Sequence, residues 1–226
     1  FVVGPGAGTS VRGVAIWGKN LYVVGGICMP VTTPQQKIFK TQGFGGDNVE
    51  IRLVGDYFDD TLAAAQAYCS EAGAAFLSPF DDDDVIEGQA SVAVEIEDQL
   101  GKTPDHIILP VGGGGLSSGV FSYFGAEPHY TLVEPEGGIS LAAALDVGAP
   151  TTLAHVDSFV DGAAVARIGD KTFARLADLS PEDVVAAPED RICATMLEML
   201  NVEGIVLEPA GALAVDALTD VADQIK

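Results

Sequence analysis

The chain has 226 residues, of which 48% are hydrophobic and 19% are charged, a composition typical of a globular protein with a large core. Acidic residues outnumber basic ones by 33 to 11, which gives a formal net charge of -22. Nucleic acids and anionic membrane surfaces repel so acidic a protein, and we therefore expect neither as a partner.

Short apolar runs alternate with helical stretches along almost the whole chain. In chain order, the expected strands are Phe1–Val3, Gly25–Met29, Val49–Val54, Ala75–Leu77, Ile107–Leu109, Tyr130–Val133, Val184–Ala187 and Ile205–Leu207. The expected helices are Val11–Leu21, Pro34–Gln42, Phe58–Ser70, Asp84–Leu100, Ile139–Leu145, Lys171–Leu179, Pro188–Leu200 and Gly211–Ala222. This alternation predicts an α/β fold of parallel sheets that are covered by helices on both faces.

We expect a smaller α/β domain at Phe1–Glu87 and a larger one at Gly88–Lys226, with a ligand between them. Neither a transmembrane span nor a signal peptide is predicted, because each apolar stretch soon ends at Gly, Pro or a charged residue. The three cysteines lack metal-ligand spacing and do not make an even disulfide set, which favours a reducing cytoplasm. The acidity is interpreted as a solvated surface, with adaptation to high salt as the alternative.

The most informative stretch is Pro110–Gly119, which holds the four consecutive glycines Gly112–Gly115. An apolar run precedes it and a helical stretch follows, so the unpaired N–H groups of a helix start would face outward. Four glycines are costly in conformational entropy and favour a loop that a guest approaches more closely than a Cβ would allow. We therefore predict a phosphate-binding loop. The alternative is a tight turn that only clears a neighbouring helix.

Two nucleotide-binding motifs also compete for this loop. The dinucleotide pattern G-x-G-x-x-G fails in the registers that start at Gly112, Gly113 and Gly114. A Walker A loop needs a lysine after its glycines, and none follows here. Both interpretations therefore rank below another kind of phosphate site.

Other polar groups are interpreted as structural. The acidic run Asp81–Asp84 stands before an expected helix, where it favours an N-cap over a metal site. His106, His129 and His155 have no partner spacing that indicates a catalytic base or a metal ligand.

The stretch Pro110–Gly119 resembles the phosphate loop of the pyridoxal-phosphate enzymes of the tryptophan-synthase fold, or fold type II. Within that group, further stretches resemble the threonine dehydratases, or threonine ammonia-lyases, in family order. These stretches are Met29–Lys37, Gly43–Gly46, Pro79–Asp82, Val85–Gln89, Asp161–Val165 and Glu208–Ala214. The chain thus looks like the middle part of such an enzyme. The resemblance implies an α/β fold of two open, mostly parallel twisted sheets with helices on both faces, incomplete at both ends.

The resemblance implies pyridoxal 5'-phosphate as the cofactor and assigns residues to it. The residues implied to bind its phosphate are Gly112, Gly113, Gly114, Gly115 and Leu116. Thr9 stands where the family has an asparagine that hydrogen-bonds the ring hydroxyl. Glu208 would lie near the ring or would simply open a helix. The lysine that holds the cofactor as a Schiff base is not in the chain in its family context, and neither is the family's ring-nitrogen segment.

A metal site is not predicted. Glu134 matches an acid that ligates a divalent cation in the related serine racemases. Ser140, however, stands at the place of a further aspartate ligand of that site.

The activity implied is deamination of threonine or serine by β-elimination, which gives a 2-oxo acid and ammonia, as in isoleucine biosynthesis. Serine racemisation, β-replacement as in cysteine synthases, and a non-catalytic phosphate- or nucleotide-binding domain remain alternatives. We expect a cytoplasmic homo-oligomer whose partner is a small amino acid. Without the lysine, the 226 residues are expected to be inactive on their own.

Overall fold

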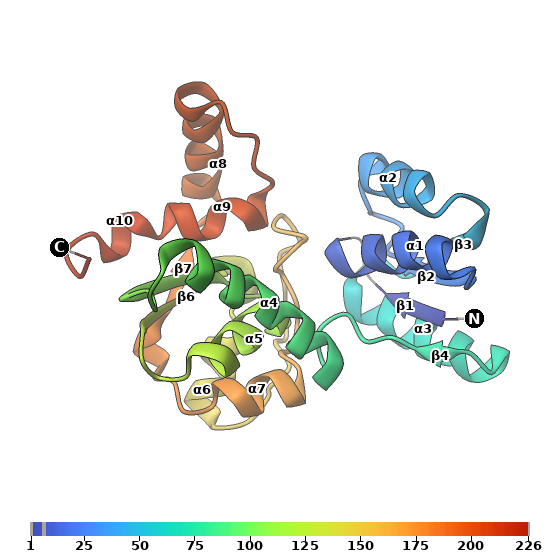
Figure 1. Cartoon of the computed structure of the whole chain (residues 1–226), viewed down its shortest axis with the longest axis horizontal. Helices are drawn as coiled ribbons and strands as arrows, with labels where there is room; N and C mark the ends of the chain where they lie inside the picture. Colours follow the sequence, from blue (N-terminus) through green and yellow to red (C-terminus); the bar gives the residue numbers. More distant parts are fainter. Residues whose placement is uncertain (1, 6–7, 226) are drawn as a thin grey trace. The chain divides into compact units, whose positions relative to one another are not determined.

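The computed structural model describes residues 2–5 and 8–225, and the chain divides into two compact units, Phe1–Pro79 and Phe80–Lys226 (Figure 1). The division predicted from the sequence, after Glu87, falls inside the helix α4 (Asp83–Leu100). The whole helix belongs to the second unit, where its buried Ala93 packs in the hydrophobic core. No described helix is both long and apolar enough to span a bilayer.

The first unit is built on a four-stranded parallel sheet in the order β3-β2-β1-β4. Its strands are β1 (Val2–Pro5), β2 (Gly25–Met29), β3 (Val49–Leu53) and β4 (Ala75–Phe76). Its helices are α1 (Thr9–Leu21), α2 (Gln35–Gly45), the short 3-10 helix η1 (Gly46–Asn48) and α3 (Phe58–Ala72). Because successive residues of a strand face opposite sides, Ile27 and Met29 pack against α1, whereas Cys28 packs against α3. Helices therefore cover both faces of the sheet.

The second unit is built on the parallel sheet β5-β6-β7, with β5 (His106–Pro110), β6 (His129–Pro135) and β7 (Val184–Ala187). Besides α4, its helices are α5 (Gly115–Phe124), α6 (Ser140–Val147), α7 (Asp170–Leu176), α8 (Glu189–Glu198), α9 (Pro209–Asp216) and α10 (Leu218–Val221). Its shorter turns are η2 (Glu136–Gly138), η3 (Pro181–Asp183) and the π-helix η4 (Met199–Glu203).

The core of the second unit also lies on both faces of its sheet. Leu132 of β6 packs in a cluster with residues of α4 to α7, and the adjacent Val133 packs in a second cluster with α8 and α9. The predicted α/β class, with parallel sheets covered on both sides, is confirmed.

Most predicted elements are present within a few residues of their expected ends, with one clear exception. The strand predicted at Ile205–Leu207 is wrong, because this segment has no regular structure and pairs with no described strand. The preceding η4 ends at Glu203, and its C-cap Gly204 has a φ of 68°, which turns the chain. Val206 is then 81% exposed, so the apolar composition of the segment does not reflect a buried strand. The predicted helix Gly211–Ala222 forms as two helices, α9 and α10.

Candidate cofactor site

The glycine loop connects the carboxyl end of β5 to the start of α5, as the sequence predicts. Val111 leaves the sheet while its N–H still donates to the carbonyl oxygen of Val133, at 2.8 Å. Gly114 is the N-cap of α5, and no side chain caps this helix. The carboxyl edge of a parallel sheet is where α/β proteins bind their ligands, so the loop stands where a binding site is expected.

Donors without partners gather at the start of α5. Among the described residues, the N–H groups of Gly113, Gly114, Gly115 and Leu116 have no hydrogen-bond partner. The first N–H that returns to the helix is that of Ser118, which donates to Gly114 at 2.9 Å. These donors, with the positive end of the helix dipole behind them, suit an anion rich in acceptor oxygens.

A buried hydroxyl lies in the same turn. The side chain of Ser117 is 1% exposed, and its Oγ has no hydrogen-bond partner. A buried polar group without a partner destabilises a fold by about 1–3 kcal/mol unless something satisfies it. The unpaired N–H groups and this hydroxyl together fit the phosphate of the cofactor implied by the sequence.

The four glycines have a second explanation, in the packing of the protein itself. A Cβ on Gly113 would overlap the ring of Phe80, and one on Gly115 would lie 3.0 Å from the Cβ of the same phenylalanine. A Cβ on Gly112 would lie 3.0 Å from the Cα of Ala163. Gly114 has a φ of 88° and faces Thr172. Protein neighbours thus require all four glycines, so the unpaired donors, rather than the glycine count, support an anion site.

The start of α7 packs on the glycine loop. The hydroxyl of Thr172 donates to the carbonyl oxygen of Gly113 at 2.7 Å, and the N–H of Gly169 approaches the same oxygen at 3.4 Å. Asp81 accepts the N–H of Lys171 through Oδ1 at 2.7 Å. No local sequence pattern predicts Thr172 or the ring of Phe80 as parts of this site.

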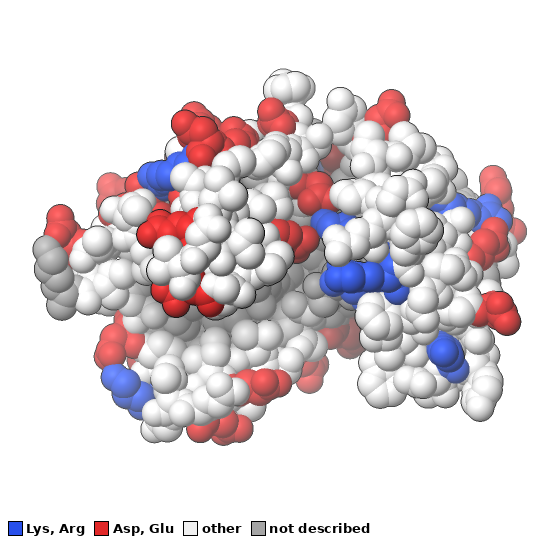
Figure 2. Space-filling view, turned by 90° about the horizontal axis from the view of Figure 1, so that it is seen from above, with Lys and Arg blue, Asp and Glu red and all other residues white. Residues whose placement is uncertain are grey.

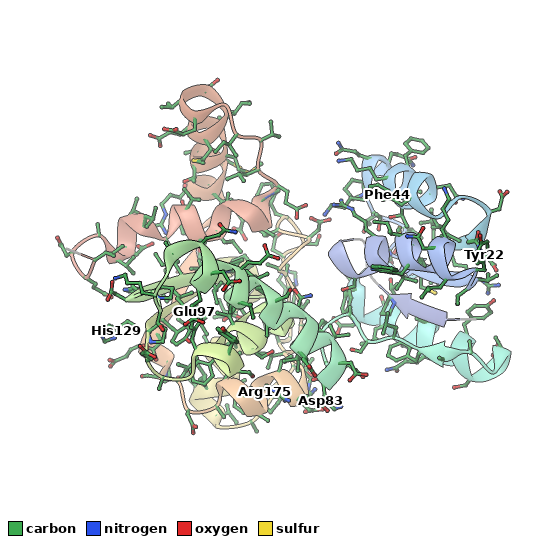
Figure 3. All side chains as sticks on the ribbon, in the orientation of Figure 1. Tyr22, Phe44, Asp83, Glu97, His129 and Arg175 are labelled. Atoms are coloured by element: carbon green, nitrogen blue, oxygen red, sulfur yellow. The ribbon has the colours of Figure 1, made fainter. Side chains whose placement is uncertain are left out.

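The acidic run lies at the starts of two helices. Asp82 accepts the N–H of Asp84 at 3.0 Å and is the N-cap of α4, which confirms the predicted cap. Asp83 pairs with Lys171 at 2.6 Å and with Arg175 of α7 at 2.8 Å, and Figure 3 shows Asp83 and Arg175 side by side. The hydrogen bond from Lys171, followed by that from Arg175, holds the pKa of Asp83 below its ordinary value. The run therefore connects the starts of α4 and α7.

Glu134 is fully buried at the end of β6, where it caps α6. Its Oε1 accepts the N–H of Leu141 at 2.7 Å, and its Oε2 accepts that of Ala142 at 2.9 Å. Burial raises the pKa of Glu134 to about 7, although the two N–H groups act in the opposite direction. Among the described residues, no three His, Cys, Asp or Glu side chains are grouped so as to hold a metal ion.

Glu208 lies beside the stretch Asp161–Val165, which also carries the family resemblance. It is the N-cap of α9, although its side chain caps no N–H of that helix. A Cβ on Gly162 would lie 2.9 Å from the Cβ of Ala210 and 3.8 Å from Oε1 of Glu208. Since Ala163 packs on Gly112, the segment around Gly162 contacts both Glu208 and the glycine loop.

Thr9 is the first residue of α1, in the other unit. Its side chain and the preceding Gly6 and Ala7 lie outside the described residues. His106 has a structural environment, since its Nε2 is 2.9 Å from Oγ1 of Thr131, and burial and then His129 lower its pKa.

The comparisons with known proteins give the family of this fold and site. The model of the family described as "Pyridoxal-phosphate dependent enzyme" matches residues 2–226. The chain belongs to this family of enzymes. Members use pyridoxal phosphate, which agrees with the cofactor expected from the sequence.

Similar proteins within this family are threonine dehydratases. The biosynthetic L-threonine dehydratase IlvA of Bacillus subtilis is 42% identical over 228 residues, covering 100% of this chain and 54% of that protein. The processed threonine deaminase isoform 2 of Solanum lycopersicum has a TM-score of 0.87 and 35% identity, covering 99% of this chain and 61% of that structure. Maize serine racemase has a TM-score of 0.83 and 27% identity, covering 96% of this chain and 65% of that structure. The chain thus spans about half the length of the curated relative.

Proposed function

We propose that the protein deaminates threonine or serine by β-elimination with pyridoxal phosphate, giving a 2-oxo acid and ammonia. The names of the similar dehydratase and deaminase support this activity. The observation that carries the proposal within the chain is the set of unpaired N–H groups at Gly113–Leu116, at the carboxyl edge of the parallel sheet.

In this proposal the glycine loop holds the phosphate end of the cofactor. The N–H groups of Gly112, Gly113, Gly114, Gly115 and Leu116 would hold the phosphate, and the dipole of α5 would favour its negative charge. The bound cofactor supplies an electron sink for the carbanion formed at the α-carbon of an amino acid. Glu208 and Thr9 are proposed to face its ring. A loop that fixes the phosphate also fixes the position of the cofactor's reactive atoms, and a displacement of those atoms by about 1 Å lowers the reaction rate strongly.

Serine racemisation is the second candidate, supported by the likeness to maize serine racemase. It uses the same fold and cofactor, so the phosphate loop does not discriminate between the two reactions. The products do, because deamination releases ammonia, whereas racemisation converts L-serine to D-serine.

The test compares the full-length protein with residues 1–226, each supplied with pyridoxal phosphate. The full-length protein is expected to form 2-oxobutanoate from threonine. The shorter chain is expected to be inactive, because none of its lysines stands in the family's context. Among them, Lys171 is exposed and paired with Asp83. Formation of D-serine without a 2-oxo acid would select the racemase, and turnover by the shorter chain would overturn the lysine argument.

We also propose a cytoplasmic homo-oligomer with a small amino acid as its only substrate class. Cys28, Cys69 and Cys193 are all free thiols in the structure, which suits a reducing compartment.

A further inference from the structure

A single hydroxyl connects α7 to the glycine loop. Thr172 is completely buried, and its Oγ1 lies 2.7 Å from the carbonyl oxygen of Gly113 and 3.2 Å from that of Gly169. A hydroxyl has only one hydrogen to donate. The carbonyl oxygen of Gly169 already accepts the N–H of Phe173 at 2.9 Å. The shorter distance assigns the hydroxyl hydrogen to Gly113.

This hydrogen bond has a consequence one atom further along the chain. The carbonyl of Gly113 and the N–H of Gly114 belong to one planar peptide group and point in opposite directions. Fixing the oxygen toward α7 therefore directs the Gly114 N–H away from α7. Among the described residues this N–H has no partner, and Gly114 has a φ of 88°, which few residues other than glycine adopt.

The threonine is itself held in place from a third segment. Asp81 accepts the N–H groups of Lys171 and Thr172 through Oδ1, at 2.7 and 3.3 Å. Its carboxylate occupies the space that a Cβ on Gly169 would fill. The adjacent Phe80 packs its ring on Gly113. The segment before α4 and the first turn of α7 thus both contact Gly113.

We propose that Thr172 is a positioning residue for cofactor binding: by holding the carbonyl oxygen of Gly113, it aims the N–H of Gly114 at the cofactor phosphate. The inference rests on the proposed function, because it assumes that the glycine loop binds that phosphate. The competing role is purely structural, with the hydroxyl serving only to stabilise the first turn of α7 through Gly169.

The experiment uses the full-length protein and three forms: wild type, Thr172→Val and Thr172→Ser. Valine keeps the shape of threonine without the hydroxyl, and serine keeps the hydroxyl. Dissociation constants are measured for pyridoxal phosphate and for pyridoxal, which lacks the phosphate. The valine form is expected to bind pyridoxal phosphate about 10-fold more weakly, the effect of one lost hydrogen bond. Its affinity for pyridoxal should stay unchanged, and the serine form should resemble wild type.

A second readout is the phosphorus NMR shift of bound pyridoxal phosphate, which should move in the valine form and stay in the serine form. Equal losses for both ligands, or no loss in the valine form, would overturn the positioning role. A wild type that binds neither ligand would instead overturn the proposed function, and this inference with it. If the valine form does not fold, Thr172→Ala against Thr172→Ser isolates the same hydroxyl and decides the question by the same criteria.

Discussion

Ser117 and Ser118 are neighbours in the first turn of α5, yet their hydroxyls have opposite situations. Ser118 donates to the carbonyl oxygen of Gly115 at 3.1 Å, whereas the buried Oγ of Ser117 has no partner. Ser117→Ala is therefore expected to leave the melting temperature of the cofactor-free protein unchanged or raised. If the hydroxyl meets the phosphate, the same change weakens pyridoxal phosphate binding about 5–10-fold.

The matched control is Ser118→Ala, which removes a satisfied hydrogen bond and should destabilise the cofactor-free protein by about 1 kcal/mol. Thermal melting without cofactor and titration with pyridoxal phosphate measure the two effects separately. Loss of stability in Ser117→Ala without loss of affinity would contradict the role given to its hydroxyl.

Glu134 makes stability depend on pH in an unusual direction for a carboxylate. Burial raises its pKa from 4.5 to about 7, so the folded protein holds this proton more tightly than the unfolded chain does. The stabilisation that Glu134 gives the folded protein is fully present below pH 4.5 and is lost as the pH rises through about 7. Glu134→Gln removes the titration, at the loss of one acceptor for the α6 N–H groups.

Urea unfolding at pH 5 and pH 8 checks this prediction for both proteins. The stability difference between wild type and Glu134→Gln should shrink as the pH rises, because only the wild type loses this contribution. A difference that stays constant between these pH values would mean that the two N–H groups, rather than burial, dominate the pKa of Glu134.

At the scale of elements, the sequence predicts most of what is local. Alternating apolar runs fix the strands and helices, and Asp82 at the start of α4 is predictable because a cap acts on its own helix. The hydrogen bond between Thr172 and Gly113 joins residues that are 59 positions apart, and a local sequence pattern cannot predict such a contact. The strand expected at Ile205–Leu207 fails for the converse reason, since its apolar residues have no neighbouring strand to pair with.

The contact of α8 with α9 depends on a buried carboxylate. Asp216 is 1% exposed, accepts from Nε of Arg191 at 2.8 Å, and accepts the hydroxyl of Thr195 at 2.9 Å. Asp216→Ala removes the acceptor of both Arg191 Nε and Thr195 Oγ1 and is expected to destabilise the protein by about 2–3 kcal/mol. Asp220 also binds Arg191 but is 33% exposed, so Asp220→Ala should cost less than about 1 kcal/mol.

Urea unfolding of the two variants measures these losses side by side. Equal losses would show that burial of Asp216 adds nothing to the strength of the pair. Asp216→Asn separates charge from hydrogen bonding, because an amide oxygen still accepts the hydroxyl of Thr195 while the ionic attraction to Arg191 is removed.

At the scale of the whole molecule, the formal charge of -22 acts on stability through repulsion among acidic side chains. Figure 2 shows Asp and Glu side chains scattered over the visible face, with few Lys and Arg between them. The ion pairs that do form are mostly exposed, as in Lys102 with Asp105 and Arg167 with Asp170, and such pairs contribute little. Weakening long-range repulsion should therefore outweigh weakening these pairs when salt is added.

We expect the melting temperature to rise with sodium chloride, and to rise most steeply below about 0.1 M. Over that range the Debye length falls from about 30 Å to about 10 Å, so distant charges stop repelling one another. Each kcal/mol of repulsion removed should raise the melting temperature by about 2–4 °C. Glycine betaine is the control, because this zwitterion is excluded from protein surfaces without screening charge. A melting temperature that stays flat below about 0.1 M salt and rises only at molar salt would contradict a merely solvated acidic surface. It would favour adaptation to high salt.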